Sequence, residues 1–199
     1  MYPFIETIKV KNGVLQNLQF HQERMNRSRS DFLGLENSIN LKSMIEVPDI
    51  ASTGVFMCRV IYGTEVGKIE FIRYKAKIVE TLKLVIDNGI DYRFKFSDRT
   101  RLEKLRSRKG DCNEILIVKN GFITDTSYSN IVFFNGKSWL TPDQPLLKGT
   151  MRAALLEKGK IKTAQIKTDD LYKFTKFKLI NAMMDFDEGN GTLIENILD

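Results

Sequence analysis

The stretch from residue 113 to residue 152 constrains the fold of this chain most, because turn signals interrupt it at short intervals. Asn120-Gly121 follows the apolar run Glu114–Lys119 and is a strong signal for a two-residue hairpin turn, since both central residues of such a turn need positive φ. A second β-rich run, Asn130–Phe134, ends at another Asn-Gly, and a short third strand ends at Pro142. The stretch therefore predicts a meander of strands.

The meander leads into a helix that begins near Gly149. Lys148, Gly149 and Thr150 precede the helix-forming run AALLEKG. Free backbone N–H groups at a helix start, next to a hydroxyl, suit a phosphate. A plain helix cap explains the same residues, and the local sequence alone favours this simpler interpretation.

The composition is that of a globular protein with a hydrophobic core: of 199 residues, 42% are hydrophobic and 28% charged. The net charge of +6 is spread along the chain, so we expect no nucleic-acid partner. No apolar run approaches the roughly 18 residues of a membrane span, and the N-terminus does not resemble a signal peptide. Cys58 and Cys112 form no CxxC motif, which indicates a reduced, cytoplasmic protein. The single histidine, His21, argues against a metal site or a Ser-His-Asp triad.

The first half of the chain predicts strands around one long helix. Strands are expected at residues 4–10, 55–62, 69–79 and 82–86. The helix is expected from His21 to Leu33, where Gly34 ends it. Its buried face would consist of three apolar residues at helical spacing: Met25, Phe32 and Leu33.

The pattern changes at the turn Asp87–Gly89, which predicts two domains, residues 1–86 and residues 87–199. The last strand of the second domain is expected at residues 178–184, and the tail after it is expected to be irregular.

Lys95 is the first candidate for chemistry, because it stands between Phe94 and Phe96. Partial desolvation by two rings would lower the pKa of a lysine, and a lysine that can be neutral can form a Schiff base. Alternation along a strand usually points a lysine to solvent, however, and the local sequence favours that interpretation.

Three further charged residues each allow two interpretations. Arg24 is either a surface charge of the helix or a bidentate phosphate ligand. Arg59, inside an apolar strand, either faces an edge or meets an anion. Asp125 follows a predicted strand and either caps a turn or keeps a pyridine nitrogen protonated.

These residues stand in an order that resembles the class IV aminotransferases, the fold-type IV pyridoxal phosphate (PLP) enzymes. The family signature has an acidic residue, an Asn five positions later, an apolar-aromatic strand, Thr-Pro and Leu-x-Gly-x-x-Arg. The matching residues are Asp125, Asn130, Ile131–Phe134, Thr141-Pro142 and Leu147–Arg152. The other matching blocks are Ile5-Glu6-Thr7, His21-Gln22-Glu23-Arg24, Lys95-x-x-x-Arg99 and Asn181-Ala182. The last two blocks resemble the aminodeoxychorismate lyase branch, and the chain is shortened at both ends relative to the family.

The resemblance implies a role for each matched residue. Lys95 would bind PLP covalently and move the proton at the substrate Cα, Asp125 would pair with the pyridinium nitrogen, and Arg24 would hold the phosphate. The other implied cofactor contacts are Thr150, Met151 and Asn181. The implied substrate contacts are Arg59, Tyr62 and Thr7.

The resemblance also implies an α/β (α+β) fold, with a small N-terminal α+β sandwich domain, a C-terminal pseudobarrel domain that carries the lysine, and a homodimer. The implied activity is that of an aminodeoxychorismate lyase, which converts 4-amino-4-deoxychorismate to 4-aminobenzoate and pyruvate. The alternatives are an aminotransferase on a D- or branched-chain amino acid and a non-catalytic ligand-binding homologue. The chain departs from the family in two places: Asp125 stands where Glu is usual, and the pocket-shaping loop is reduced to Gly63–Gly67.

Overall fold

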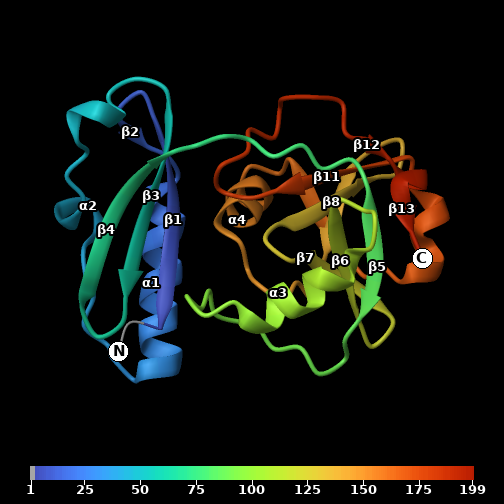
Figure 1. Cartoon of the computed structure of the whole chain (residues 1–199), viewed down its shortest axis with the longest axis horizontal. Helices are drawn as coiled ribbons and strands as arrows, with labels where there is room; N and C mark the ends of the chain where they lie inside the picture. The colour runs from blue at the N-terminus through green and yellow to red at the C-terminus, as the bar shows by residue number, and fades with distance from the viewer. Residues whose placement is uncertain (1–2) are drawn as a thin grey trace. The chain divides into compact units, whose positions relative to one another are not determined.

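The structure, a computed structural model, describes residues 3–199, which divide into two compact units (Figure 1). The first unit consists of the chain up to Ala76 together with Phe94–Asp98, and the second consists of Lys77–Arg93 and Arg99–Asp199. The units differ from the expected division after residue 86 because residues 82–86 pair with a strand of the second unit, whereas Phe96 bridges to Phe4 in the first. Lys95 therefore belongs to the first unit.

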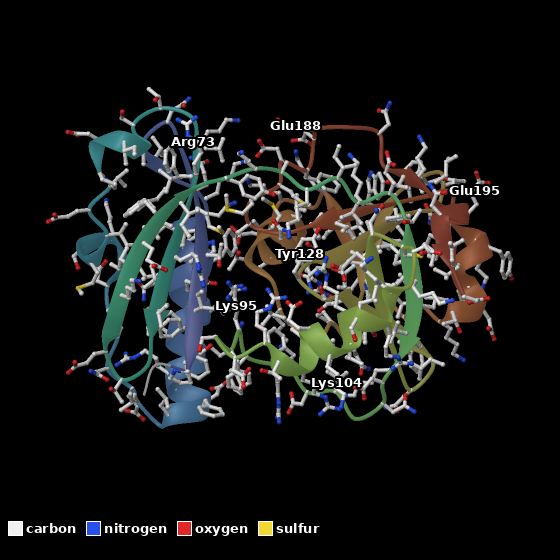
Figure 2. The ribbon with its side chains drawn as sticks, viewed as in Figure 1. Arg73, Lys95, Lys104, Tyr128, Glu188 and Glu195 are labelled. Atoms are coloured by element: carbon white, nitrogen blue, oxygen red, sulfur yellow. The ribbon has the colours of Figure 1, made fainter. Side chains whose placement is uncertain are left out.

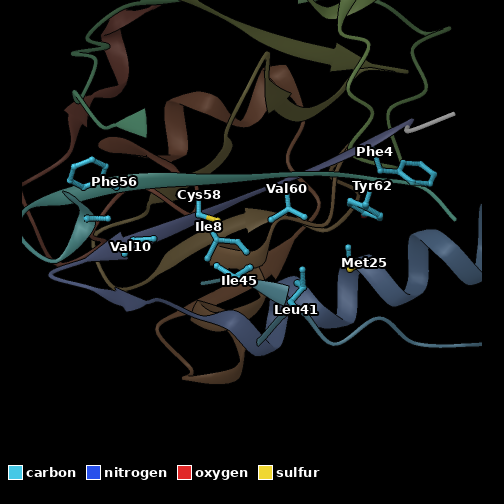
Figure 3. Close-up of a cluster of buried hydrophobic side chains, with 11 residues drawn as sticks. Phe4, Ile8, Val10, Met25, Leu41, Ile45, Phe56, Cys58, Val60 and Tyr62 are labelled. Carbon is cyan, nitrogen blue, oxygen red and sulfur yellow. The ribbon is translucent and has the colours of Figure 1, made fainter. Parts of the chain in front are cut away.

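The first unit is an antiparallel sheet in the order β2-β1-β3-β4, covered on one face by helix α1. Its elements are β1 (Phe4–Lys11), β2 (Val14–Leu15), α1 (Leu18–Leu33), α2 (Leu41–Met44), a 3₁₀ turn (Asp49–Ala51), β3 (Val55–Tyr62) and β4 (Val66–Arg73). Strand β3 buries every second residue, so Phe56, Cys58, Val60 and Tyr62 share one face. Figure 3 shows these side chains in the core between the sheet and α1.

Helix α1 ends as expected at Leu33, with Gly34 at a φ of 67° after it, but it begins three residues earlier than expected. Met25 is fully buried, as predicted. The prediction for Phe32 was wrong: its side chain is 50% exposed and makes an edge-to-face contact with Phe4 at 5.3 Å between ring centroids. The buried face of α1 is instead largely polar, and it consists of Phe20, His21, Arg24, Met25, Ser28 and Arg29.

The second unit contains a five-stranded sheet, β10-β9-β8-β11-β12, and a four-stranded sheet, β13-β5-β6-β7. The strands of the first sheet are β8 (Asn130–Phe134), β9 (Trp139–Pro142), β10 (Ile161–Ala164), β11 (Lys176–Ile180) and β12 (Thr192–Leu193). Those of the second are β5 (Leu82–Ile86), β6 (Glu114–Lys119), β7 (Phe122–Thr126) and β13 (Ile197–Leu198). The helices are α3 (Thr100–Arg106) and α4 (Thr150–Glu157), with 3₁₀ turns at Ser107–Lys109, Thr168–Lys173 and Ile194–Asn196.

Strand β6 shows why its sequence is a continuous apolar run. Leu116 and Val118 pack into the core that contains residues of both sheets, whereas Ile115 and Ile117 pack against α3 on the opposite face. A strand covered on both faces has no solvent side, so it needs apolar residues at every position.

The turn that follows β6 is confirmed, with φ of 52° at Asn120 and 80° at Gly121. Two other expectations were wrong. The last long strand, β11, spans Lys176–Ile180 rather than residues 178–184, and the tail is not irregular throughout, because β12 pairs with β11 and β13 pairs with β5. Among residues 3–199, no helix is long and apolar enough to cross a membrane.

Candidate active site

Asp125 lies at the centre of a buried hydrogen-bonded cluster in the second unit. It belongs to β7 itself, not to the turn after it, and both of its carboxylate oxygens accept hydrogen bonds. Asn130 Nδ2 donates to Oδ1 at 2.7 Å, and the backbone N–H of Leu147 donates to Oδ2 at 2.9 Å. Asn130 Nδ2 also donates to the Leu147 carbonyl at 2.8 Å, so three parts of the family signature are joined through Asn130.

Burial raises the pKa of Asp125 to about 6. The hydrogen bonds from Leu147 and Asn130 and the positive charge of Arg152 act in the opposite direction, but they do not outweigh the loss of hydration. A carboxylate in this state gains stability from a cationic group placed against its oxygens. The site is therefore suited to a ligand with a positively charged N–H.

Position 149 needs a glycine because it lies very close to the Asn130 side chain, and not because of its backbone angles. Its φ of −68° and ψ of 147° are open to any residue, but a Cβ at this position would lie 2.0 Å from Asn130 Oδ1. Only glycine lets the start of α4 approach the asparagine that holds Asp125.

The start of helix α4 brings two of the predicted cofactor contacts next to this cluster. Thr150 is buried and Met151 half-buried in the first turn, where backbone N–H groups lack carbonyl partners within the helix. Arg152 Nη2 donates to the Pro142 carbonyl at 2.8 Å, which attaches the helix to the end of β9. The last residue of the signature thus has a structural contact.

Asn181, the third predicted cofactor contact of this unit, lies directly after β11. Its Nδ2 donates to Ser129 Oγ at 2.8 Å, and Ser129 directly precedes Asn130. Asn181 is therefore joined to the residue that directly precedes Asn130, the partner of Asp125.

In the first unit, Arg24 is buried and forms a bidentate pair with Glu6. Arg24 Nε donates to Glu6 Oε1 at 2.8 Å, and Nη2 donates to Oε2 at 2.5 Å. His21 Nδ1 lies 2.6 Å from Glu6 Oε2, and both Glu6 and His21 are fully buried. The bidentate partner of Arg24 is thus a carboxylate of the chain, which the sequence analysis did not anticipate.

The electrostatics of this group favour a charged Glu6 and a neutral His21. Burial alone would raise the pKa of Glu6, but the charge of Arg24 and hydrogen bonds from His21 and Arg24 lower it to about 2. The pKa of His21 is lowered, first by burial and further by the positive charges of Arg24 and Lys95, against the raising effect of Glu6. A neutral His21 donates its Nδ1 proton to Glu6.

Lys95, labelled in Figure 2, is half-buried on a segment that continues the sheet at the edge of β1. The backbone N–H of Ile5 donates to the Lys95 carbonyl at 3.0 Å, and Phe96 bridges to Phe4. The Phe96 ring stacks on Phe4 at 5.5 Å between centroids. Backbone pairing and aromatic packing on both sides of Lys95 fix the position of the segment.

The predicted substrate contacts do not form one group. Arg59 pairs across the sheet with Thr7, and its guanidinium lies 3.8 Å from Glu70. Tyr62 points to the opposite face of β3, where it is fully buried in the core and burial raises its pKa. The sheet therefore presents Thr7 and Arg59 on one face and Tyr62 on the other.

Several residues of the site have partners far away in the chain, and the local sequence around them does not indicate those partners. Glu6 and Asn130 were recognised only as parts of motifs, and Gly149 only as a helix start. The five-residue spacing of Asp125 and Asn130 was the one local signal, and it could not show which backbone groups they would meet.

Comparisons with known proteins identify the family of the chain. The profile of the family "Amino-transferase class IV" matches residues 98–186, which include Asp125, Asn130, Gly149 and Asn181. An uncharacterised protein of Haemophilus influenzae is 41% identical over 185 residues, covering 92% of this chain and 98% of the relative.

Several solved structures share the fold. A protein from Haemophilus somnus that carries the provisional name 4-amino-4-deoxychorismate lyase superposes with a TM-score of 0.87 at 36% identity, covering 92% of this chain and 97% of that one. A hypothetical aminotransferase from Mycobacterium tuberculosis in its PLP-bound form superposes with a TM-score of 0.74 at 16% identity, covering 91% and 78%. With the signature assembled around Asp125 and relatives this similar over nearly the full length, the chain belongs to the class IV aminotransferase family and has the fold of the fold-type IV PLP enzymes.

Proposed function

We propose that this protein is a PLP-dependent lyase that converts 4-amino-4-deoxychorismate to 4-aminobenzoate and pyruvate. The observation that supports PLP as the cofactor is the buried Asp125. Its two carboxylate oxygens accept hydrogen bonds from Asn130 and Leu147, and its pKa is raised to about 6. The provisional lyase name of the Haemophilus somnus protein, at 36% identity, supports the choice of reaction.

The residues present fit PLP by their chemistry. Asp125 would bind the protonated ring nitrogen, whose positive charge compensates the burial of the carboxylate. The phosphate would be bound by Thr150 and Met151 at the start of α4 and by Arg24, with Asn181 as a further contact. Arg24 keeps its position for this role through Glu6.

Bound PLP would supply an electron sink for the carbon that carries the substrate's amino group. Lys95 would hold the cofactor and, once the substrate has displaced it, its Nζ would accept the proton from that carbon. Loss of this proton and cleavage of the C–O bond on the neighbouring ring carbon, whose electron pair leaves with enolpyruvate, give an aromatic ring. The released enolpyruvate takes up a proton and becomes pyruvate.

The first experiment adds PLP to the purified protein, records the visible absorption, reduces with borohydride and maps the labelled peptide. We expect a visible band and a label on Lys95. Lys95→Ala should lose both, whereas Lys104→Ala, which removes an exposed lysine, should keep both. No band, or a label spread over surface lysines, would contradict a PLP enzyme and favour a ligand-binding homologue.

The second experiment separates the reactions. Pyruvate release from 4-amino-4-deoxychorismate is measured beside a panel of D- and branched-chain amino acids paired with keto acids. We expect pyruvate release. Activity confined to the panel would contradict the lyase and identify an aminotransferase.

We also propose a homodimer, as the resemblance to the family implies. Light scattering coupled to size exclusion should give twice the chain mass of 23.0 kDa. A chain that remains monomeric at micromolar concentration with PLP bound would refute the dimer without affecting the cofactor proposal.

A further inference from the structure

Ser127 Oγ and Arg99 Nε are among the buried side-chain polar atoms that have no hydrogen-bond partner within residues 3–199. Ser127 is only 2% exposed, and the Arg99 side chain is about one-third exposed although its Nε atom is buried. Buried polar atoms are nearly always paired in native proteins, so an unpaired atom calls for a partner from outside the chain.

The two atoms belong to residues that are in contact. Arg99 Nη2 donates to the Ser127 carbonyl at 2.9 Å and lies 3.5 Å from Glu103 Oε1. Nε and Nη2 form one edge of the guanidinium group, the edge that binds a carboxylate with two parallel hydrogen bonds. One donor of this edge is held by Ser127, and the neighbouring donor is unpaired.

The turn that carries Ser127 is fixed independently of Arg99. Thr126 N–H donates to the Ser129 carbonyl at 2.9 Å, and Ser129 N–H donates to Thr126 Oγ1 at 3.0 Å. Asp125 stands two residues before Ser127 in the chain, and Lys95 stands four residues before Arg99.

The chemistry of the two atoms defines their ligand. An arginine Nε can only donate a hydrogen bond, and a serine hydroxyl beside it can donate a second. The complement is an acceptor with negative charge. The guanidinium group excludes a cation, and its planar edge matches the geometry of a carboxylate.

We propose that Arg99 and Ser127 form a subsite for a carboxylate of the substrate. This proposal rests on the proposed function, whose substrate carries a ring carboxylate that is retained in 4-aminobenzoate. It differs from the assignment to Arg59 and Tyr62, because those two side chains lie on opposite faces of β3. Arg59 is also within ion-pair distance of Glu70.

The test measures two dissociation constants by calorimetry with the PLP-loaded protein, for 4-aminobenzoate and for 4-aminobenzamide. The ratio of the dissociation constant for the amide to that for the acid measures how much the carboxylate contributes to binding. We expect a ratio of about 10 or more in the wild type, as a charge-assisted hydrogen bond implies. The ratio should approach one in Arg99→Gln and fall several-fold in Ser127→Ala.

Arg101→Gln is the matched control, because Arg101 is an exposed arginine in the first turn of α3, two residues after Arg99, and it pairs with Asp87. Its ratio should equal that of the wild type. Ser127→Thr, which keeps the hydroxyl, should retain the preference for the acid. Ser127→Ala should not lower the urea midpoint of the apoprotein, because it removes a buried hydroxyl that has no partner.

An unchanged ratio in both Arg99→Gln and Ser127→Ala, or an equal loss in Arg101→Gln, would overturn the subsite. So would a wild-type ratio near one in protein that holds PLP on Lys95. Failure of the wild type to bind PLP at all is a different result, since it refutes the proposed function through the visible band before any probe is added.

Discussion

Gly149→Ala is the sharpest test of how the Asp125 cluster is built. Taken by its backbone angles alone, this substitution should stabilise the protein by about 0.4–1 kcal/mol, because alanine has fewer unfolded conformations than glycine. The φ of −68° and ψ of 147° at Gly149 are fully compatible with alanine. The new Cβ, however, would lie 2.0 Å from Asn130 Oδ1 and 3.2 Å from its Cγ, so Asn130 must move.

Displacement of Asn130 breaks two hydrogen bonds. One goes to the Asp125 carboxylate at 2.7 Å and one to the Leu147 carbonyl at 2.8 Å. A bond to a charged group contributes about 1.5–3 kcal/mol and one between neutral groups about 0.5–1.5 kcal/mol, so their combined loss is about 2–4 kcal/mol. After the backbone gain is subtracted, we expect a net destabilisation of about 1–3 kcal/mol. The two arguments predict opposite signs.

A double-mutant cycle with Asn130→Ala assigns the effect to this contact. The free energy of unfolding of the apoprotein is measured in urea for the wild type, both single variants and the double variant. If the clash acts through Asn130, Gly149→Ala should cost nothing, or stabilise slightly, once Asn130 is alanine, and the coupling should be about 2 kcal/mol. Equal costs in both backgrounds would refute the reasoning, and so would a stabilising single variant. Weaker PLP binding in Gly149→Ala would show that the loss reaches Asp125.

Two further predictions concern pH. The pKa of Asp125 is raised from 3.8 to about 6, so its contribution to apoprotein stability is fully present below 3.8 and is lost as the pH rises through about 6. The stability difference between the wild type and Asp125→Asn should therefore shift against the wild type by about 3 kcal/mol between about pH 4 and about pH 8, and a constant difference would contradict this assignment. The pKa of Glu6 is lowered from 4.5 to about 2, so its contribution is present above 4.5 and is lost as the pH falls through about 2. Glu6→Gln should cost about 3–5 kcal/mol at neutral pH, because it leaves Arg24 buried without its carboxylate, and the cost should shrink in acid. A pH-independent cost, or a cost under 1 kcal/mol, would show that the ion pair does not hold Arg24.

The elements that the sequence predicted well are those specified by neighbouring residues. The Asn120-Gly121 turn follows from the positive φ that both positions need, and β3 appears at Val55–Tyr62 with the alternating burial of a strand covered on one face. Such local rules do not depend on distant partners. The boundary after residue 86 depends on them, because Leu82–Ile86 looks like any strand until it pairs in parallel with Glu114–Val118.

Helix α1 shows where hydrophobicity misleads. Its apolar residues suggested Phe32 for the interior, yet the interior holds His21, Arg24 and Arg29. Arg29 is 1% exposed and donates to the carbonyls of Gly63 and Thr64, and Arg24 meets Glu6 from another strand. Charged residues are buried where paired, and their partners lie too far along the chain for a periodic pattern to indicate them.

The presence of Asp125 where the family usually has Glu follows from the same geometry. Asp125 Oδ2 reaches the Leu147 N–H at 2.9 Å and Oδ1 reaches Asn130 at 2.7 Å, so both contacts already fit the shorter side chain. A glutamate on the same backbone would carry its carboxylate about 1.5 Å further, one C–C bond, and would overrun both donors. Gly149 already lies close to the Asn130 side chain, so Asn130 cannot move towards Gly149 to make room for a longer acid. In this chain Asp125, Asn130 and Gly149 therefore depend on one another, because a change in any of them shifts the atoms that hold the carboxylate.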